Sequence, residues 1–333
     1  MSANITVRRG KGVEMAAVEG VKVWWEGMNG LKPNRMTPAE ARQLEVVRVR
    51  AGMDWDVGRV PAQYTIPGEG LRDWPERHIL YRKDNGLPLG EVSNRYKIHQ
   101  PRQILGFFND ILKLGNARME TAGTLHGGRK FWAMARIADA ADALCKGDEV
   151  RAYLLATTSV DGSGPTTVTE TTTCVVCSNT LQMALNGKGE RIRIPHSTEF
   201  SADVMKQVQD RLATTAKTFG AFMSAGKALA KIRVTEEAAA RFVEDLLRER
   251  KVIAAEDPAK SKGYVKILEL FNGGQMGADL KSRKGTAWGL VNAVTEWVDH
   301  NEKRTGSAAV ETAWFGWGDA LKSAALGKAL ELV

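Results

Sequence analysis

The chain has 333 residues, of which 43% are hydrophobic and 26% are charged, with a formal net charge of +8 at pH 7. This length is sufficient for a substantial core, and the absence of any run of roughly 18 apolar residues argues against a membrane span. With no apolar signal core behind the N-terminal charges, we expect a cytoplasmic protein. Three cysteines are too few for a disulfide framework. The positive charge is compatible with nucleic acid, but no segment forms a basic tail, so any basic groove must be assembled by the fold.

Residues 1–89 carry the signals of short strands and one helix. Thr37 and Glu40 flank Pro38 in a capping box, in which both side chains satisfy N–H groups of a first helical turn, and this predicts a helix to about Arg50. The turn Asp84-Asn85-Gly86 separates two β-rich segments and predicts a hairpin, because Asn and Gly accept left-handed backbone angles. We expect this part to feed strands and a helix into a sheet.

Residues 90–198 predict a helix, a β-meander and a second helix. Apolar residues at helical spacing favour a helix over about 101–114, and glycine-containing turns at 126–129 and 161–164 then separate β-rich segments. A further helix is predicted from about Asn179. In the strand after the first turn, one face is apolar and carries Phe131, Ala133, Ala135 and Ile137. The other face combines an aromatic ring with cations and carries Lys130, Trp132, Met134 and Arg136.

Residues 199–333 predict helices. Ser201 and Thr235 have the positions of N-caps, the first for a long Ala-rich helix to about Ile232 and the second for a helix that ends before Asp257. Residues 286–300 and 307–332 complete the helices. The whole pattern predicts an α+β protein: a central antiparallel β-meander, within a sheet from about 45 to 175, packed by helices and followed by an α-helical C-terminal region.

Several uncommon sequence motifs, taken in chain order, resemble those of phage- and plasmid-type proteins of the family called domain of unknown function 932. These motifs are GEVSNRYKIHQ (90–100), METAGTLHGGRKFWAMARI (119–137), CVVCSNTLQMAL (174–185) and GTAWGLVNAVTEWVDHNEKRTG (285–306). The resemblance implies a mobile-element origin in a bacterial host and no particular activity. The predicted order of elements is also similar to the core of phage single-strand annealing proteins, which implies an oligomer that holds single-stranded DNA in a basic groove.

We therefore hypothesise a non-enzymatic protein that binds single-stranded DNA and promotes strand annealing in recombination without ATP, as a homo-oligomer. Such a protein needs cations along the phosphates and aromatic faces for the bases. The candidate contact residues are Arg95, Tyr96, Lys97, Arg102, Arg129, Lys130, Trp132 and Arg151. The alternative is that the charged residues form a solvated turn and that the aromatic residues belong to the core. No phosphate-binding loop of the GxxxxGK[ST] type occurs, so no nucleotide cofactor is expected.

Two other classes of function remain open. Glu296, Asp299 and His300 lie near one stripe of a predicted helix with Asn292, and such a set can hold a divalent metal in a nuclease. Glu120 or Asp161 would then be further ligands, and an ion-paired helix surface is the alternative. The third class is a protein-binding module, such as an inhibitor of host defence.

Cys174 and Cys177 have the spacing of half a zinc site or of a redox pair. The second half of a zinc site is missing from the sequence, although Cys145 and His196 are conceivable remote partners. Packing with free thiols is the alternative interpretation.

Overall fold

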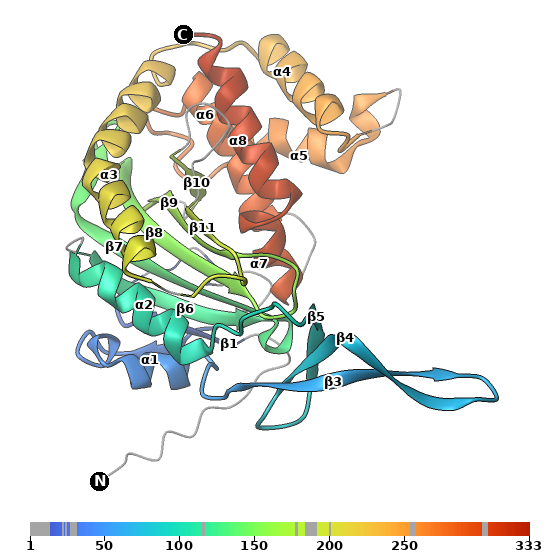
Figure 1. Cartoon of the computed structure of the whole chain (residues 1–333). Coiled ribbons are helices and arrows are strands. Elements are labelled where there is room, and N and C mark those ends of the chain that lie inside the picture. The colour runs from blue at the N-terminus through green and yellow to red at the C-terminus, as the bar shows by residue number, and fades with distance from the viewer. Residues whose placement is uncertain are drawn as a thin grey trace.

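The computed structural model describes residues 14–21, 23, 25–26, 32–114, 117–176, 179–183, 192–199, 201–253, 257–301 and 306–333. Figure 1 shows a twisted sheet that lies among helices, with a small second sheet that projects from one end of the molecule. The predicted fold class, a mixed α+β protein with a helical C-terminal region, is confirmed.

The larger sheet is built on the predicted meander. Its strand order is β10-β9-β8-β7-β6-β1-β2, with β11 paired to β9, and the pairs are antiparallel except for β1 with β2. Its strands are β1 (Glu14–Val18), β2 (Asn34–Met36), β6 (Ala117–Leu125), β7 (Lys130–Ala143), β8 (Glu149–Ser159), β9 (Thr166–Cys174), β10 (Thr180–Gln182) and β11 (Ile192–Ile194). The two predicted turns connect β6 to β7 and β8 to β9, and Gly127 and Gly162 have the positive φ angles, 70° and 83°, that such turns require.

The smaller sheet has the order β3-β4-β5 and consists of β3 (Val57–Ile66), β4 (Gly70–Arg82) and β5 (Pro88–Ser93). The hairpin predicted at Asp84-Asn85-Gly86 is confirmed as the β4–β5 connection. The expectation that these strands join the central sheet is wrong, because β5 lies across the β8–β9 turn instead. Gly90 permits this approach, since a Cβ there would lie 2.3 Å from the carbonyl oxygen of Asp161.

The helices are α1 (Leu44–Arg50), α2 (Pro101–Leu114), α3 (Ala202–Leu229), α4 (Glu236–Glu249), α5 (Lys262–Glu269), α6 (Ala287–Glu296), α7 (Gly306–Trp314) and α8 (Trp317–Leu330). The predicted N-caps are confirmed, because the hydroxyls of Ser201 and Thr235 accept hydrogen bonds from the first turns of α3 and α4. The capping box at Thr37 and Glu40 also forms, although it opens a short 3₁₀ turn, Glu40–Arg42, ahead of α1. In the part of the chain that the structure describes, no helix combines the length and apolar character needed to cross a bilayer.

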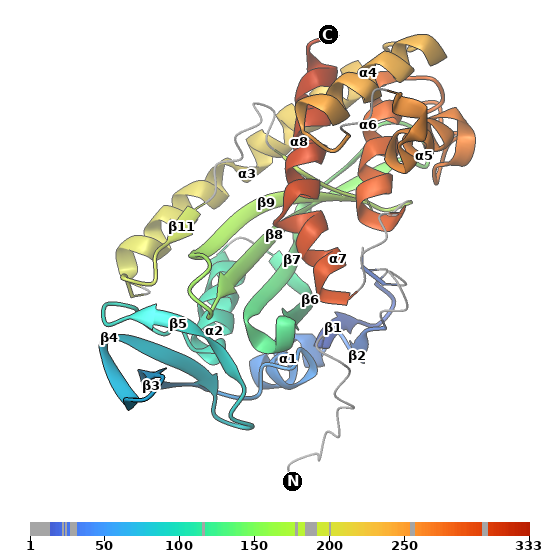
Figure 2. The same cartoon turned by 90° about the vertical axis from the view of Figure 1, so that its right-hand side faces the viewer.

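Helices cover both faces of the meander. On one face, Phe131 and Ala133 of β7 join a core with α1, α2 and the first half of α3. On the other face, Trp132 and Met134 join a second core with α6, α7, α8 and the end of α3. Figure 2 shows α7 and α8 crossing in front of the strands on this second face. Residues 131–135 of β7 are therefore buried on both faces, whereas Lys130, Arg136 and Ile137 are only half-buried.

The described residues at the start of the helix predicted from about Asn179 are not helical, because Thr180–Gln182 forms β10 and pairs with β9. Among the residues that the structure describes, the next helix begins at Ala202. The backbone N–H and the hydroxyl of Thr180 donate hydrogen bonds to the buried Asp299 carboxylate, at 2.8 and 3.1 Å. These hydrogen bonds to Asp299, which is distant in the sequence, stabilise the extended conformation of Thr180 over the weak local preference for a helix.

Candidate nucleic-acid interface

Five of the predicted contact residues lie at one end of the meander, where its turns meet the small sheet. The Tyr96 hydroxyl donates a hydrogen bond to the carbonyl of Ser159, at 3.0 Å. Ser159 is paired with Lys130 across the β7–β8 ladder, and the N–H of Val160, directly after β8, donates to the carbonyl of Arg129, at 2.8 Å. These contacts bring together Arg95, Tyr96, Lys97, Arg129 and Lys130.

The other three predicted residues lie elsewhere. Trp132 is 1% exposed and cannot stack on a base, because its ring is packed inside the core. Arg151 lies eight residues before Ser159 on the same strand, which separates them by roughly 26 Å. Arg102 is on α2, where its guanidinium pairs with the Glu45 carboxylate at 3.1 Å. These three residues therefore do not join the cluster, and helices pack over the face of the meander on which Trp132 lies.

Two of the five clustered residues carry charges without a partner. Lys97 pairs with Glu199 at 2.9 Å, and Lys130 pairs with Glu311 of α7. Arg95 and Arg129 are exposed, and neither guanidinium has a hydrogen-bond or carboxylate partner among the described residues. These two side chains are available to an anion from outside the molecule.

Tyr96 lies between two surface hollows. One has a volume of about 900 Å³, and its wall includes Arg59, Lys97 and His99. The other has a volume of about 530 Å³, and its wall includes Arg95 and His196. The segment 95–97 thus presents cationic side chains on both sides of one half-buried aromatic ring.

Neutral histidines hold this tyrosine in place. The ring of His196 stacks on Tyr96, with centroids 4.5 Å apart, and the ring centroid of His99 lies 4.3 Å from that of His196. Burial, followed by the proximity of His99, lowers the pKa of His196 to about 4, so this ring is uncharged at neutral pH. Its Nδ1–H accordingly donates to the carbonyl of Lys97, at 3.1 Å. The histidines support the site but contribute no positive charge.

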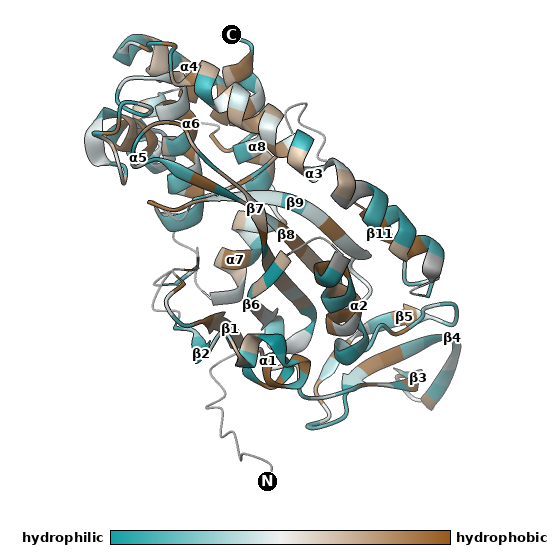
Figure 3. Ribbon diagram, turned by 90° about the vertical axis from the view of Figure 1, so that its left-hand side faces the viewer, coloured by the Kyte–Doolittle hydropathy of each residue, from teal (hydrophilic) through white to brown (hydrophobic). Residues whose placement is uncertain are grey.

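An exposed aromatic face occurs on the projecting part of β3 and β4, which we call the arm (residues 60–76). Trp74 and Tyr64 are 39% and 44% exposed. The pairs Ala62↔Trp74 and Tyr64↔Arg72 place both rings on one face of the hairpin, next to a guanidinium. Figure 3 shows that the ribbons of β3 and β4 carry both apolar and polar residues.

Sequence reasoning missed this arm, although a signal was available. Pro67-Gly68 is a turn dipeptide between two alternating segments, and it marks the tip of a second hairpin. The base of the arm contacts residues 94–96. Arg59, which directly precedes the arm, donates to the carbonyls of Asn94 and Tyr96, at 3.2 and 3.4 Å. The Asn94 amide also donates to the Pro75 carbonyl, at 3.2 Å.

The residues of the alternative metal site do not come together. Asp299 is fully buried and pairs with Lys322 at 2.7 Å. The Glu296 carboxylate accepts hydrogen bonds from the N–H of Met276, at 3.2 and 3.0 Å, and burial raises its pKa. His300 is exposed. No group of three or more His, Cys, Asp or Glu residues in the described ranges could hold a metal ion.

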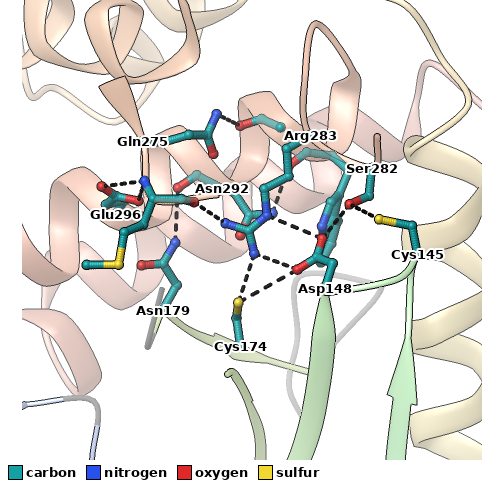
Figure 4. Close-up of polar contacts among 12 residues, drawn as sticks. Cys145, Asp148, Cys174, Asn179, Gln275, Ser282, Arg283, Asn292 and Glu296 are labelled. Atoms are coloured by element: carbon teal, nitrogen blue, oxygen red, sulfur yellow. Dashed lines mark hydrogen bonds and ion pairs between the residues drawn. The ribbon is translucent and has the colours of Figure 1, made fainter. Parts of the chain in front are cut away.

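Cys174 belongs to a buried polar network that joins the meander to the loop before α6 (Figure 4). The guanidinium of Arg283 contacts Asp148 at 2.7 Å and the Cys174 sulfur at 2.8 Å, and both charged residues are fully buried. The Ser282 hydroxyl donates to Asp148 at 2.6 Å and lies 3.2 Å from the Cys145 sulfur. Cys177 lies outside the described residues. Cys174 thus packs against an ion pair that locks two parts of the fold.

Comparisons with known proteins identify a family but no activity. Residues 88–314 match the model of the family described as Domain of unknown function (DUF932). No curated protein matches the chain, and no solved structure does. The family predicted from the sequence motifs is confirmed. The similarity of element order to annealing proteins finds no support, because the strand β10 lies where the predicted helix was expected to begin.

Proposed function

Because the chain belongs to the family of the domain of unknown function DUF932, whose description assigns no activity, we propose from its surface chemistry that it binds single-stranded DNA without ATP and promotes strand annealing. One observation carries the proposal: unpaired cations and exposed aromatic rings occur on connected elements. Arg95 and Arg129 lie where the turns of the meander meet the small sheet, a place that we call the root of this sheet, and Tyr64 and Trp74 lie on its arm. Single strands are bound by this combination of phosphate contacts and base stacking.

The paired cations add to this surface. Lys97 pairs with Glu199 at the root, and Arg72 pairs with Glu69 on the arm at 2.7 Å. Exposed ion pairs of this kind are worth only about 0–1 kcal/mol, so a phosphate can replace the carboxylate at low cost. The strand would run from the arm to segment 95–97, with its backbone on the cations.

The small number of aromatic rings on this surface favours annealing over tight sequestration of the bases. Two exposed rings on the arm and one half-buried ring at Tyr96 hold few bases by stacking, so most bases of a bound strand stay free to pair. Contacts to phosphate carry no sequence information, which agrees with annealing of arbitrary complementary strands. A homo-oligomer would extend the same surface along a longer strand.

The test is a polarisation titration of labelled oligo-dT at about 50 and 200 mM salt. We expect sub-micromolar affinity at low salt, a steep loss at high salt and weaker binding to duplex DNA. The variant Arg95→Ala/Arg129→Ala should reduce the salt slope by about one unit per residue. Arg250→Ala is the matched control, because Arg250 is exposed at the end of α4. Salt-insensitive binding, or an unchanged slope in the double variant, contradicts the proposal.

Annealing is measured separately, as the rate at which two labelled complementary oligonucleotides pair without nucleotide. We expect acceleration by the native chain and by Arg250→Ala, and a loss in the double variant. Tight binding without acceleration limits the function to strand protection and rejects annealing.

A further inference from the structure

A third concave region lies between residues 18–21, α1, α2 and strands β6 and β7. Its volume is about 560 Å³, which falls within the usual range of small-molecule sites. Its walls are mainly apolar and are supplied by separate elements: Val18, Val21, Leu44, Val47, Leu112 and Met119. None of the proposed DNA contacts lines this hollow.

The charged residues of this hollow are mostly cationic. Four cations line it, Arg42, Lys113, Arg118 and Arg136, against the carboxylates of Glu19 and Glu120. Lys113 is paired with Asp110, at 3.0 Å. Arg42 and Arg118 are exposed and have no carboxylate within 4 Å among the described residues. The rim therefore has positive charge that the protein itself does not neutralise.

A buried carboxyl fixes the guanidinium in the wall. Glu120 is 6% exposed, accepts a hydrogen bond from the Tyr153 hydroxyl at 2.9 Å and pairs with the Nε of Arg136 at 3.0 Å. Burial raises the pKa of Glu120, so its negative charge is costly there. The terminal nitrogens of Arg136 have no hydrogen-bond partner within the described parts of the chain, and this leaves donors in a fork suited to a carboxylate.

We propose that this hollow binds a small amphipathic carboxylate, whose apolar chain lies against the aliphatic walls and whose head group contacts Arg136 and the rim arginines Arg42 and Arg118. The apolar lining disfavours a strand of nucleic acid, which needs a cationic track along its phosphates. The excess of unpaired cations disfavours an amphipathic amine. The apolar lining and the positive charge together favour an amphipathic carboxylate as the ligand.

Decanoate is the probe, and isothermal titration of the full chain is the measurement. Decyltrimethylammonium has the same apolar chain and the opposite charge, so it separates head-group recognition from general apolar binding. We expect saturable binding of decanoate at one site per chain and no saturable binding of the ammonium compound. Equal binding of the two probes, or no binding of decanoate, overturns the proposal.

Two variants locate the site. Arg42→Ala/Arg118→Ala removes exposed side chains only, so we expect native unfolding behaviour and about tenfold weaker decanoate binding. Ala41→Trp places a large ring in the half-buried wall and should abolish binding. Arg250→Ala, which lies far from the hollow, should bind as the native chain does. Undiminished affinity in the double variant and in Ala41→Trp, with the fold intact by circular dichroism, places the binding elsewhere and rejects this site.

Discussion

Trp132 of β7 packs edge to face against Trp314 of α7, with ring centroids 5.4 Å apart. Trp25 also packs edge to face against Trp132, with ring centroids 6.4 Å apart. A cluster of three tryptophans thus occupies the centre of the face that strand alternation alone would assign to a ligand. The ring that was a candidate for base stacking instead joins the C-terminal helices to the meander.

Replacement of Trp132 should therefore affect stability and not DNA contact. Trp132→Ala leaves a large cavity, and we expect a loss of about 3–5 kcal/mol in the free energy of unfolding, measured by urea denaturation. The salt slope of oligo-dT binding should stay native under conditions where the variant is folded. A variant of native stability that has lost DNA binding would contradict this assignment.

The two faces of the arm should differ in their effect on DNA. Trp74→Ala removes an exposed stacking ring, and we expect a loss of about 1–3 kcal/mol in binding of oligo-dT, measured by polarisation. Leu71→Ala is the matched control, because Leu71 pairs with Thr65 on the opposite face of the same hairpin and is 64% exposed. The two variants should have the same unfolding midpoint. Equal losses of affinity would show that the aromatic face has no special role.

The buried pair of Lys322 and Asp299 should be structural. Lys322→Met leaves the Asp299 carboxylate buried with only Thr180 as a donor among the described contacts, and we expect a loss of about 3–5 kcal/mol in unfolding free energy. The double variant Lys322→Met/Asp299→Asn removes both charges and should recover part of this loss. Urea denaturation measures both.

The nuclease alternative has its own test. We expect no magnesium- or manganese-dependent cleavage of DNA by the native chain, because Glu296 and Asp299 are engaged by other groups. Cleavage that disappears in Glu296→Gln while the chain remains folded would reverse this expectation.

Acid should destabilise the fold through His196. Its folded-state pKa is about 4 and lies below the usual value near 6.5, so the unfolded chain takes up the proton first. Stability is therefore complete above about pH 6.5 and falls as the pH approaches 4, by up to about 3 kcal/mol from this group. His99, whose pKa burial also lowers, contributes with the same sign.

His196→Phe keeps a ring against Tyr96 but removes the titration. We expect urea midpoints that depend less on pH between about 6.5 and 4 than those of the native chain, with the remaining dependence due to His99 and the carboxyl groups. An unchanged pH profile would show that His196 is not the group responsible.

Local signals in the sequence were sufficient for most of the elements. Glycines at 86, 127 and 162 specify turns by their backbone freedom, and Ser201 and Thr235 specify helix starts through hydrogen bonds within one turn. These interactions join residues that are close in the chain, so the sequence contains all of their geometry. The meander, the β4–β5 hairpin and the helical C-terminal region follow from them.

Only the tertiary structure decided what covers each face and which charges stay free. Alternation showed that Lys130, Trp132 and Met134 share a face of β7, but that face is closed by Trp314, which lies far along the chain. The ammonium group of Lys130 forms an ion pair with Glu311, which is also distant in the sequence. Arg95 and Arg129, in contrast, have no carboxylate partner among the described residues. Period-two patterning determines the side of a strand, while burial and ion pairing depend on long-range packing that no local pattern contains.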